Sequence, residues 1–193
     1  MRLYERPLAF IDTETTGLSP QKHEIIDVAI IFDAKVLATP KSWTRHLKPI
    51  APGIVGWHTK IRPQRLEDAE PKALEVNKYD PKLWASAPPV SEVIDVLLDI
   101  LTDSRAVLGG HNVNFDKEFI TNTALRCFRS PRLGYHLVDT VTVCYEHLVP
   151  CGLDSLSLDS VRQYLGIPMQ NNHTALQDAL DARDVYLRLT GRR

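Results

Sequence analysis

The sequence predicts an α/β fold in which helices cover a central β-sheet. The first 35 residues contain two β-branched, apolar runs, at 8–11 and 24–32, and amphipathic stretches alternate with short apolar runs from residue 91 onward. Leading strands followed by alternating helices and strands are typical of this architecture. A chain of 193 residues with 44% hydrophobic and 24% charged residues is large enough for its own core. Because no internal repeat or linker is visible, we expect a single domain over 1–193.

The N-terminal half begins with a buried strand at 8–11 that ends at Asp12 and is followed by a turn around Gly17 and Pro20. The run at 24–32 predicts a second strand, and 36–47 is a candidate for its hairpin partner. Residues 48–89 are rich in Pro, Trp and charge. Their weak periodicity predicts a long connection with one or two short helices.

Regular structure is again expected from Ser91, which is a candidate N-cap for an amphipathic helix. The run at 105–110 predicts a strand that ends at two glycines, and 137–140 predicts a short strand. A helix over 114–128 would turn Phe115, Phe119, Ile120 and Leu125 inward. Further helices are expected at 142–148, 155–165 and 174–189.

Charge and cysteine content restrict the class of protein. The 23 basic residues nearly balance 24 acidic ones, for a formal net charge of −1, which argues against a strongly basic nucleic-acid wrapper. The three cysteines contain no CxxC pair, so reduced thiols are expected. No apolar run approaches the roughly 20 residues that span a bilayer, and no signal peptide is visible. These observations predict a cytoplasmic protein without a membrane partner.

Acidic residues occur at three places in the chain where a cleft is expected. Asp12 and Glu14 come where the first strand ends, and their spacing of two places both carboxylates on one side. Asp116 falls in the first turn of the helix at 114–128, and Asp178 lies one turn inside the last helix, with His173 at its start. Adjacent carboxylates repel, and a divalent cation relieves that repulsion. Taken singly, these residues also fit a solvated strand-edge pair, a helix cap and a surface histidine.

Three motifs occur in order along the chain, namely FIDTETTGL at 10–18, HNVNFD at 111–116 and HTALQDA at 173–179. Together they resemble the exonuclease motifs of the DnaQ-like DEDDh 3′→5′ exonucleases, such as the exonuclease domain of the polymerase III epsilon proofreading subunit. The resemblance covers about 7–189 and is weakest over 48–89. It implies a ribonuclease-H-like fold, in which helices flank a central mixed sheet on both faces.

The resemblance also implies a two-metal mechanism. Asp12, Glu14 and Asp178, with Asp116 acting through water, would hold two Mg²⁺ ions, for which Mn²⁺ would substitute, and His173 would be the general base. The implied products are nucleoside 5′-monophosphates released from a 3′ end.

The same resemblance assigns residues to the terminal nucleotide. The backbone of Thr15 would approach the 3′-hydroxyl, Leu18 would pack on the last base, and Asn112 and Phe115 would support the second motif. Ordinary core packing is an almost equal alternative for Leu18 and Phe115.

Two acid-free windows, at 36–66 and 126–138, combine basic residues with aromatic ones, which suits single-stranded nucleic acid but also fits two solvated faces. The resemblance, through the TTGL turn of the first motif, implies single-stranded or frayed 3′ ends of DNA as the partner. An RNA-trimming exoribonuclease and a catalytically silent end-binding module stay open as alternatives. Because the chain ends at Arg193 without the long tail of the epsilon subunit, we expect a stand-alone or differently tethered nuclease, with no identifiable polymerase or repair partner.

Overall fold

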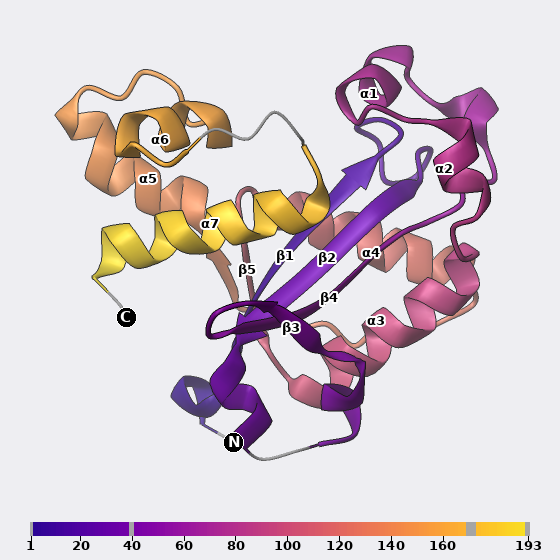
Figure 1. Ribbon diagram of the computed structural model, residues 1–193, viewed down its shortest axis with the longest axis horizontal. Coiled ribbons are helices and arrows are strands. Elements are labelled where there is room, and N and C mark those ends of the chain that lie inside the picture. Colours follow the sequence, from indigo (N-terminus) through magenta and orange to yellow (C-terminus); the bar gives the residue numbers. More distant parts are fainter. Residues whose placement is uncertain (1, 39–40, 169–172, 192–193) are drawn as a thin grey trace.

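A computed structural model describes residues 2–38, 41–168 and 173–191 (Figure 1). Six strands form one mixed sheet in the order β3-β4-β2-β1-β5-β6. The strands are β1 (Leu8–Thr15), β2 (Ile25–Asp33), β3 (Lys48–Ala51), β4 (Ile54–Lys60), β5 (Val107–Gly110) and β6 (Leu137–Asp139). Strands β1 to β4 pair antiparallel, whereas β5 runs parallel to both β1 and β6. The predicted mixed sheet with flanking helices is confirmed.

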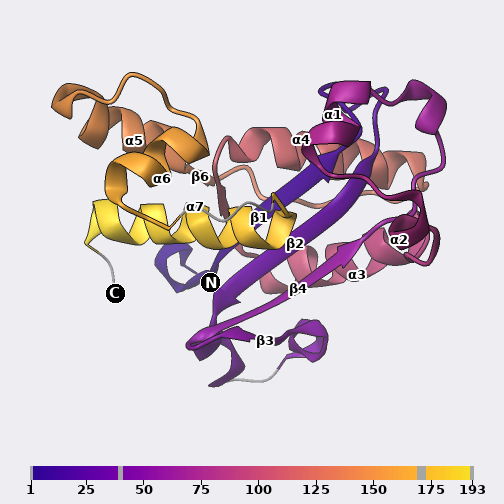
Figure 2. The same cartoon turned by 45° about the horizontal axis from the view of Figure 1, so that its top comes forward.

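Helices cover both faces of this sheet. They are α1 (Pro71–Val76), α2 (Pro81–Ala85), α3 (Val90–Ser104), α4 (Val113–Arg126), α5 (Thr140–Leu148), α6 (Leu158–Leu165) and α7 (Ala175–Thr190). In Figures 1 and 2, α3 and α4 lie on one face, and α7 crosses the other with α5 and α6 beside it. Helix α1 lies near the end of β1 that carries the first motif (Figure 1).

The two faces of the sheet follow from side-chain alternation along β1 and β2. Ile11 and Ile30 belong to the core cluster that also contains the buried faces of α3 and α4. Phe10 and Ile31 instead pack with Ala179 and other residues of α7. Residues at even positions of β1 therefore face α7, and this parity also places the side chains of Asp12 and Glu14 on the α7 side.

Several predicted elements were wrong in place or type. Residues 36–47 are no strand: two 3-10 segments, Ala34–Ala38 and Ser42–His46, lie there, and β2 pairs with β4 instead. The predicted connection at 48–89 contains β3 and β4 as well as α1 and α2. The prolines and charges around β4 obscured its apolar start. Position 56 of this strand requires glycine, because the Cβ of any other residue would lie only 2.6 Å from the Ile30 carbonyl oxygen.

Helix boundaries and one buried position also differ from expectation. Pro89 rather than Ser91 is the N-cap of α3. Leu125 was expected to face inward but is 57% exposed, since α4 packs through Phe119, Ile120 and Ala124. Cys127, Cys144 and Cys151 are free thiols. Among the described helices, none is both long and apolar enough to span a membrane.

Candidate active site

Three carboxylates converge on the α7 side of the sheet. Asp12 and Glu14 come from β1, and Asp178 comes from the first turn of α7. One carboxylate oxygen of each lies within 4.8 Å of the others, which is a spacing that a bound cation can bridge. The two elements are far apart in the sequence, so only the fold brings these acids together.

Local structure explains why α7 approaches the strand so closely. The helix begins at Ala175 after its N-cap Thr174, whose hydroxyl accepts a hydrogen bond from the backbone N–H of Gln177 at 3.3 Å. Ala175 and Ala179 are fully buried against the sheet. Their small side chains let the first turn, which includes Asp178, lie close to β1.

Asp116 lies behind this group rather than within it. It is in the first turn of α4, is only 3% exposed and accepts a hydrogen bond from the Thr13 hydroxyl at 2.7 Å. Thr13 faces α4, on the opposite side of β1 from Asp12 and Glu14. Asp116 therefore lies next to the cluster, but its carboxylate oxygens are not among those that lie within 4.8 Å of one another.

Burial and mutual repulsion make the four acids hard to ionise. Burial raises the pKa of Asp12 well above its usual range, and the charges of Asp116 and Glu14 raise it further. The pKa of Glu14 rises to about 8, mainly through burial and then through Asp178 and Asp27. Burial also raises the pKa of Asp116 to about 7 and that of Asp178 to about 6.

The donor set fits a divalent cation. Oε1 of Glu14 is buried and has no hydrogen-bond partner among the described residues. A buried carboxylate oxygen without a donor costs free energy unless a cation or proton satisfies it. Carboxylate oxygens are also the preferred ligands of hard divalent ions. The acidic cluster thus has the chemistry of a metal site, with Glu14 as its unsatisfied member.

His173 lies at the start of α7, as the spacing predicts. Its Nδ1 atom is 3.6 Å from Oδ2 of Asp178, and its side chain is 38% exposed. The histidine is therefore next to the carboxylates but also reachable from solvent. This position suits a group that exchanges protons with bulk water.

The expected substrate residues have different environments. Thr15 is buried, and its hydroxyl donates to the Gly17 carbonyl at 2.8 Å. Leu18 is 75% exposed, so it does not belong to the core. Phe115 is partly buried and packs on Phe119, with ring centroids 4.7 Å apart. Packing in the core accounts for Phe115, whereas it does not account for Leu18.

Asn112 has a backbone role in the second motif. It is the N-cap of α4, and its φ of 63° lies in the left-handed region. Its backbone N–H donates to Oδ1 of Asp139 at 3.0 Å. Asparagine tolerates this conformation better than most residues. Asn112 therefore sets the direction in which α4 and Asp116 leave β5.

Sequence reasoning missed a fifth acid, which is buried at the edge of this site. Asp27 faces Glu14 across the β1–β2 pair and binds Lys60 Nζ at 3.2 Å. The ammonium of Lys60 also lies 3.9 Å from the ring centroid of Trp84. A lone aspartate within the apolar run of β2 was the available signal. The Lys60 contacts had no signal in sequence, because they join three separate elements.

Helix α1 is tied to the segment that follows Glu14. The side-chain amide of Asn77 donates to the Thr15 carbonyl at 2.8 Å, and the Glu70 amide donates to the Thr16 carbonyl at 2.8 Å. Part of the connection that the sequence left undefined is thus a support for the first motif.

Much of the predicted basic surface is committed to structural contacts. Arg45 binds Asp99, and Arg129 binds Asp95 with its Nε 2.6 Å from Oδ1. Trp43 is only 2% exposed. Within the two windows, the exposed residues that remain to contact single-stranded nucleic acid include Lys48, Arg62, Arg132 and Tyr135. The basic surface is smaller than the two windows suggested.

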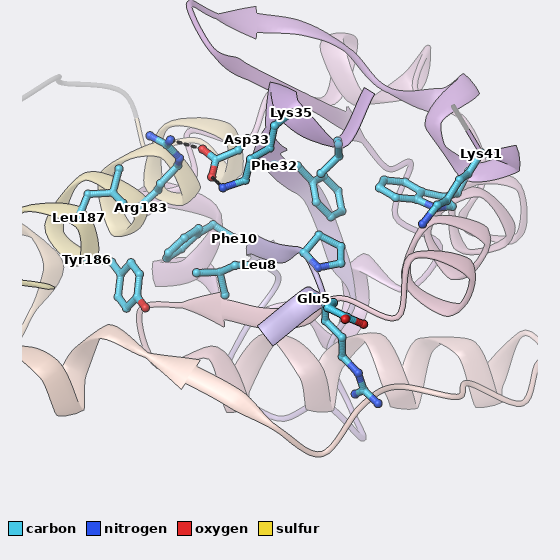
Figure 3. Close-up of a pocket in the computed structure, with 14 residues that line it drawn as sticks. Glu5, Leu8, Phe10, Phe32, Asp33, Lys35, Lys41, Arg183, Tyr186 and Leu187 are labelled. Atoms are coloured by element: carbon cyan, nitrogen blue, oxygen red, sulfur yellow. Dashed lines mark hydrogen bonds and ion pairs between the residues drawn. The ribbon is translucent and has the colours of Figure 1, made fainter. Parts of the chain in front are cut away.

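A cavity of about 540 Å³ lies elsewhere, around the N-terminal half of β1 (Figure 3). Leu8, Phe10 and Tyr186 form part of its wall, and Asp33 lies between Lys35 and Arg183 at its rim. None of the acids of the cluster lines it. Pocket size therefore does not mark the active site here.

The mixed sheet with helices on both faces is a ribonuclease-H-like fold, and acids gather against its first strand. Residues 9–186 match the RNase_T family, which is described as "Exonuclease". The chain belongs to this exonuclease family.

Named relatives fall into more than one branch of the family. The chain is 31% identical over 183 residues to a PolC-type DNA polymerase III of Thermotoga maritima, covering 92% of this chain and 11% of that protein. It is 26% identical to ribonuclease T of Marinobacter nauticus, covering 94% of this chain and 81% of that protein. The chain thus spans about a tenth of the length of the polymerase that it matches.

Among solved structures, the fold is similar to that of E. coli exonuclease I in complex with a dA16 oligonucleotide. The TM-score is 0.74 at 20% identity, and the match covers 98% of this chain and 42% of that one.

Proposed function

We propose that residues 1–193 act as a single metal-dependent 3′→5′ exonuclease domain of the DEDDh type. Its substrate would be DNA with a single-stranded or frayed 3′ end, and its products nucleoside 5′-monophosphates. The observation that carries the proposal is the convergence of Asp12, Glu14 and Asp178 within 4.8 Å, with Nδ1 of His173 3.6 Å from Asp178. Carboxylates for metals and an adjacent base are the groups that phosphodiester hydrolysis requires.

The acids would hold two divalent ions, Mg²⁺ by preference or Mn²⁺. Asp12, Glu14 and Asp178 would bind directly, and Asp116 through water because it lies behind Asp12. Such a pair of ions would activate water and stabilise charge on the attacking and leaving oxygens. The protein's part is to hold the four acids in fixed positions on β1 and in the first turns of α4 and α7, and a bound cation would favour their ionised form.

His173 would act as the general base. Its Nδ1 faces the acidic cluster and would accept the proton of the attacking water, after which the exposed ring returns that proton to bulk solvent. The exposed side chain of Leu18, three residues after Thr15, would pack on the terminal base. Thr15 would meet the terminal sugar through its backbone, which Asn77 holds in place.

Several observations favour DNA ends as the substrate. The polymerase relative is named for DNA synthesis, and the structural neighbour binds a DNA oligonucleotide. The name of that relative also makes a polymerase or a repair complex a reasonable partner, and a bacterial replication enzyme acts in the cytoplasm. Ribonuclease T is named for RNA, so RNA is the competing substrate.

A labelled-substrate assay tests the proposal. Single- and double-stranded DNA and RNA of equal sequence, labelled at the 5′ end, are incubated with Mg²⁺, Mn²⁺ or EDTA. We expect a ladder that shortens from the 3′ end with DNA and a divalent ion, none with EDTA or Asp12→Ala, and a strongly slowed one with His173→Ala. Faster cleavage of RNA than of DNA would show that RNA, not DNA, is the substrate. Activity that persists in EDTA or in Asp12→Ala would refute the mechanism, and metal-dependent binding without cleavage would indicate a silent module.

A further inference from the structure

His173 is bracketed by two carboxylates, and only one of them belongs to the metal cluster. Nδ1 faces Asp178, whereas Nε2 lies 3.8 Å from Oδ2 of Asp159. Asp159 is in the first turn of α6, outside all three motifs. The ring therefore lies between acids on two different helices.

A buried arginine, Arg162, forms an ion pair with Asp159. Arg162 is only 1% exposed and is the largest fully buried side chain among the described residues. Its Nη1 lies 3.4 Å from Oδ1 of Asp159 and 3.0 Å from Oδ2 of Asp181 on α7. Its Nη2 donates to the Pro168 carbonyl at 2.8 Å.

Arg162 contacts the chain before and after His173. Its guanidinium donates to the Pro168 carbonyl, forms an ion pair with Asp181 on α7, and also pairs with the acid that faces the histidine ring. Burying a guanidinium is expensive unless several acceptors satisfy it. Arg162 thus joins α6 to α7 at a defined spacing.

We propose that Asp159 is a positioning residue for His173, an inference that rests on the proposed exonuclease function. Oδ2 of Asp159 lies 3.8 Å from Nε2, and this contact would shorten to a hydrogen bond from Nε2–H when substrate binds. Catalytic hydrogen bonds are often long before substrate binds. The bond keeps the proton on Nε2 and leaves the lone pair of Nδ1 facing the acidic cluster.

Asp159 then acts twice in the proton transfer. The O–H bond of water breaks, its proton forms an N–H bond at Nδ1, and the resulting hydroxide attacks phosphorus as the bond to the 3′ oxygen breaks. Solvent protonates the departing oxygen, and the imidazolium returns its proton to solvent. Asp159 fixes the tautomer beforehand and balances the imidazolium charge while it lasts, as in other base–carboxylate pairs.

A purely structural role predicts a different outcome. An acid in the first turn of a helix stabilises that helix by about 0.3–1 kcal/mol through the helix dipole. If this were its whole role, Asp159→Asn would change stability slightly and leave turnover unchanged. Kinetic readouts therefore separate the two roles.

The test compares Asp159→Asn and Asp159→Glu with Asp154→Asn, a control at an exposed acid of the preceding loop. Steady-state cleavage of a 3′-labelled oligonucleotide is measured at saturating Mg²⁺. We expect Asp159→Asn to lower kcat about 10–100-fold with little change in KM, as loss of a partner that orients a functional histidine does. Asp159→Glu should recover part of kcat, and Asp154→Asn should match the wild type.

A double-mutant cycle shows whether the effect passes through the histidine. In a His173→Ala background, Asp159→Asn should cause no further loss, and Mn²⁺ titrated by calorimetry should bind all variants alike. A loss that persists without His173, or Asp159→Asn turnover equal to that of Asp154→Asn, would overturn the inference alone. Wild-type activity that is absent or insensitive to His173→Ala would overturn the proposed function and this inference with it.

Discussion

The two sides of the acidic cluster are held in place by different means. Asp12 and Glu14 are part of β1, which is hydrogen-bonded to β2 on one edge and to β5 on the other. His173 precedes α7, is 38% exposed and lies between the carboxylates of Asp159 and Asp178. The backbone of a paired strand holds the first two acids, whereas side chains of two separate helices surround the histidine. Changes on the two sides should therefore have different consequences for activity and for stability.

The strand side is tested most directly by Glu14→Gln. We expect cleavage to fall at least about 10³-fold, equivalent to roughly 4 kcal/mol, because a metal ligand is lost. The metal-free protein should in turn become more stable at pH 8.5, because a buried, repelled carboxylate is replaced by a neutral amide. Cleavage rates and chemical denaturation in EDTA measure both effects. A variant that loses activity and stability together would show that Glu14 has a structural role instead.

On the helical side, Arg162→Ala should lower stability, whereas Glu14→Gln should raise it. Removing this cation leaves Asp181, which is only 5% exposed, without its ion-pair partner, and we expect a loss of about 3–5 kcal/mol in the free energy of unfolding. Arg129→Ala is the control, since its ion pair with Asp95 is exposed, involves neither α6 nor α7 and should contribute little to stability. Equal losses in urea denaturation would contradict the idea that Arg162 joins α6 to α7.

The acids also predict how pH affects the metal-free protein. The pKa values of Asp178, Asp116 and Glu14 rise to about 6, 7 and 8, so the folded state binds more protons than the unfolded state above pH 4. Stability is then greatest at low pH in this window and falls as pH rises through 6 to 8. At about 1.4 kcal/mol per pKa unit, with relief by solvent, a loss of about 2–3 kcal/mol between pH 5 and 8.5 is expected.

Thermal unfolding at fixed ionic strength, with EDTA or with Mg²⁺, measures this dependence. Bound cations should flatten the curve, because they stabilise the ionised acids. A metal-free curve that is flat or rises with pH would mean that the acids are not coupled as the geometry indicates.

The difference between the two sides also explains how far the sequence could predict the molecule. Asp12 and Glu14 were found because strand alternation is local, and His173 and Asp178 because their helix start is readable. Asp27, Lys60, Asp159 and Arg162 were missed. Their roles depend on contacts between elements far apart in sequence, which periodicity does not encode. For the same reason β4, an interior strand among prolines and charges, was assigned to a connection.

The smallest predicted effect concerns Leu18, which neither side of the cluster positions. Its side chain is 75% exposed beside the first motif, so Leu18→Ala should leave stability within about 0.5 kcal/mol of the wild type. If the leucine packs on the terminal base, KM for a single-stranded oligonucleotide should rise about threefold to tenfold, since base stacking is worth about 1–3 kcal/mol. Leu37→Ala is the control, because Leu37 is also exposed but lies in the Ala34–Ala38 segment that follows β2. Equal KM values for the two variants would show that Leu18 does not bind substrate. A rise in KM for Leu18→Ala alone would show that the substrate site includes Leu18 as well as the metal ligands and the base.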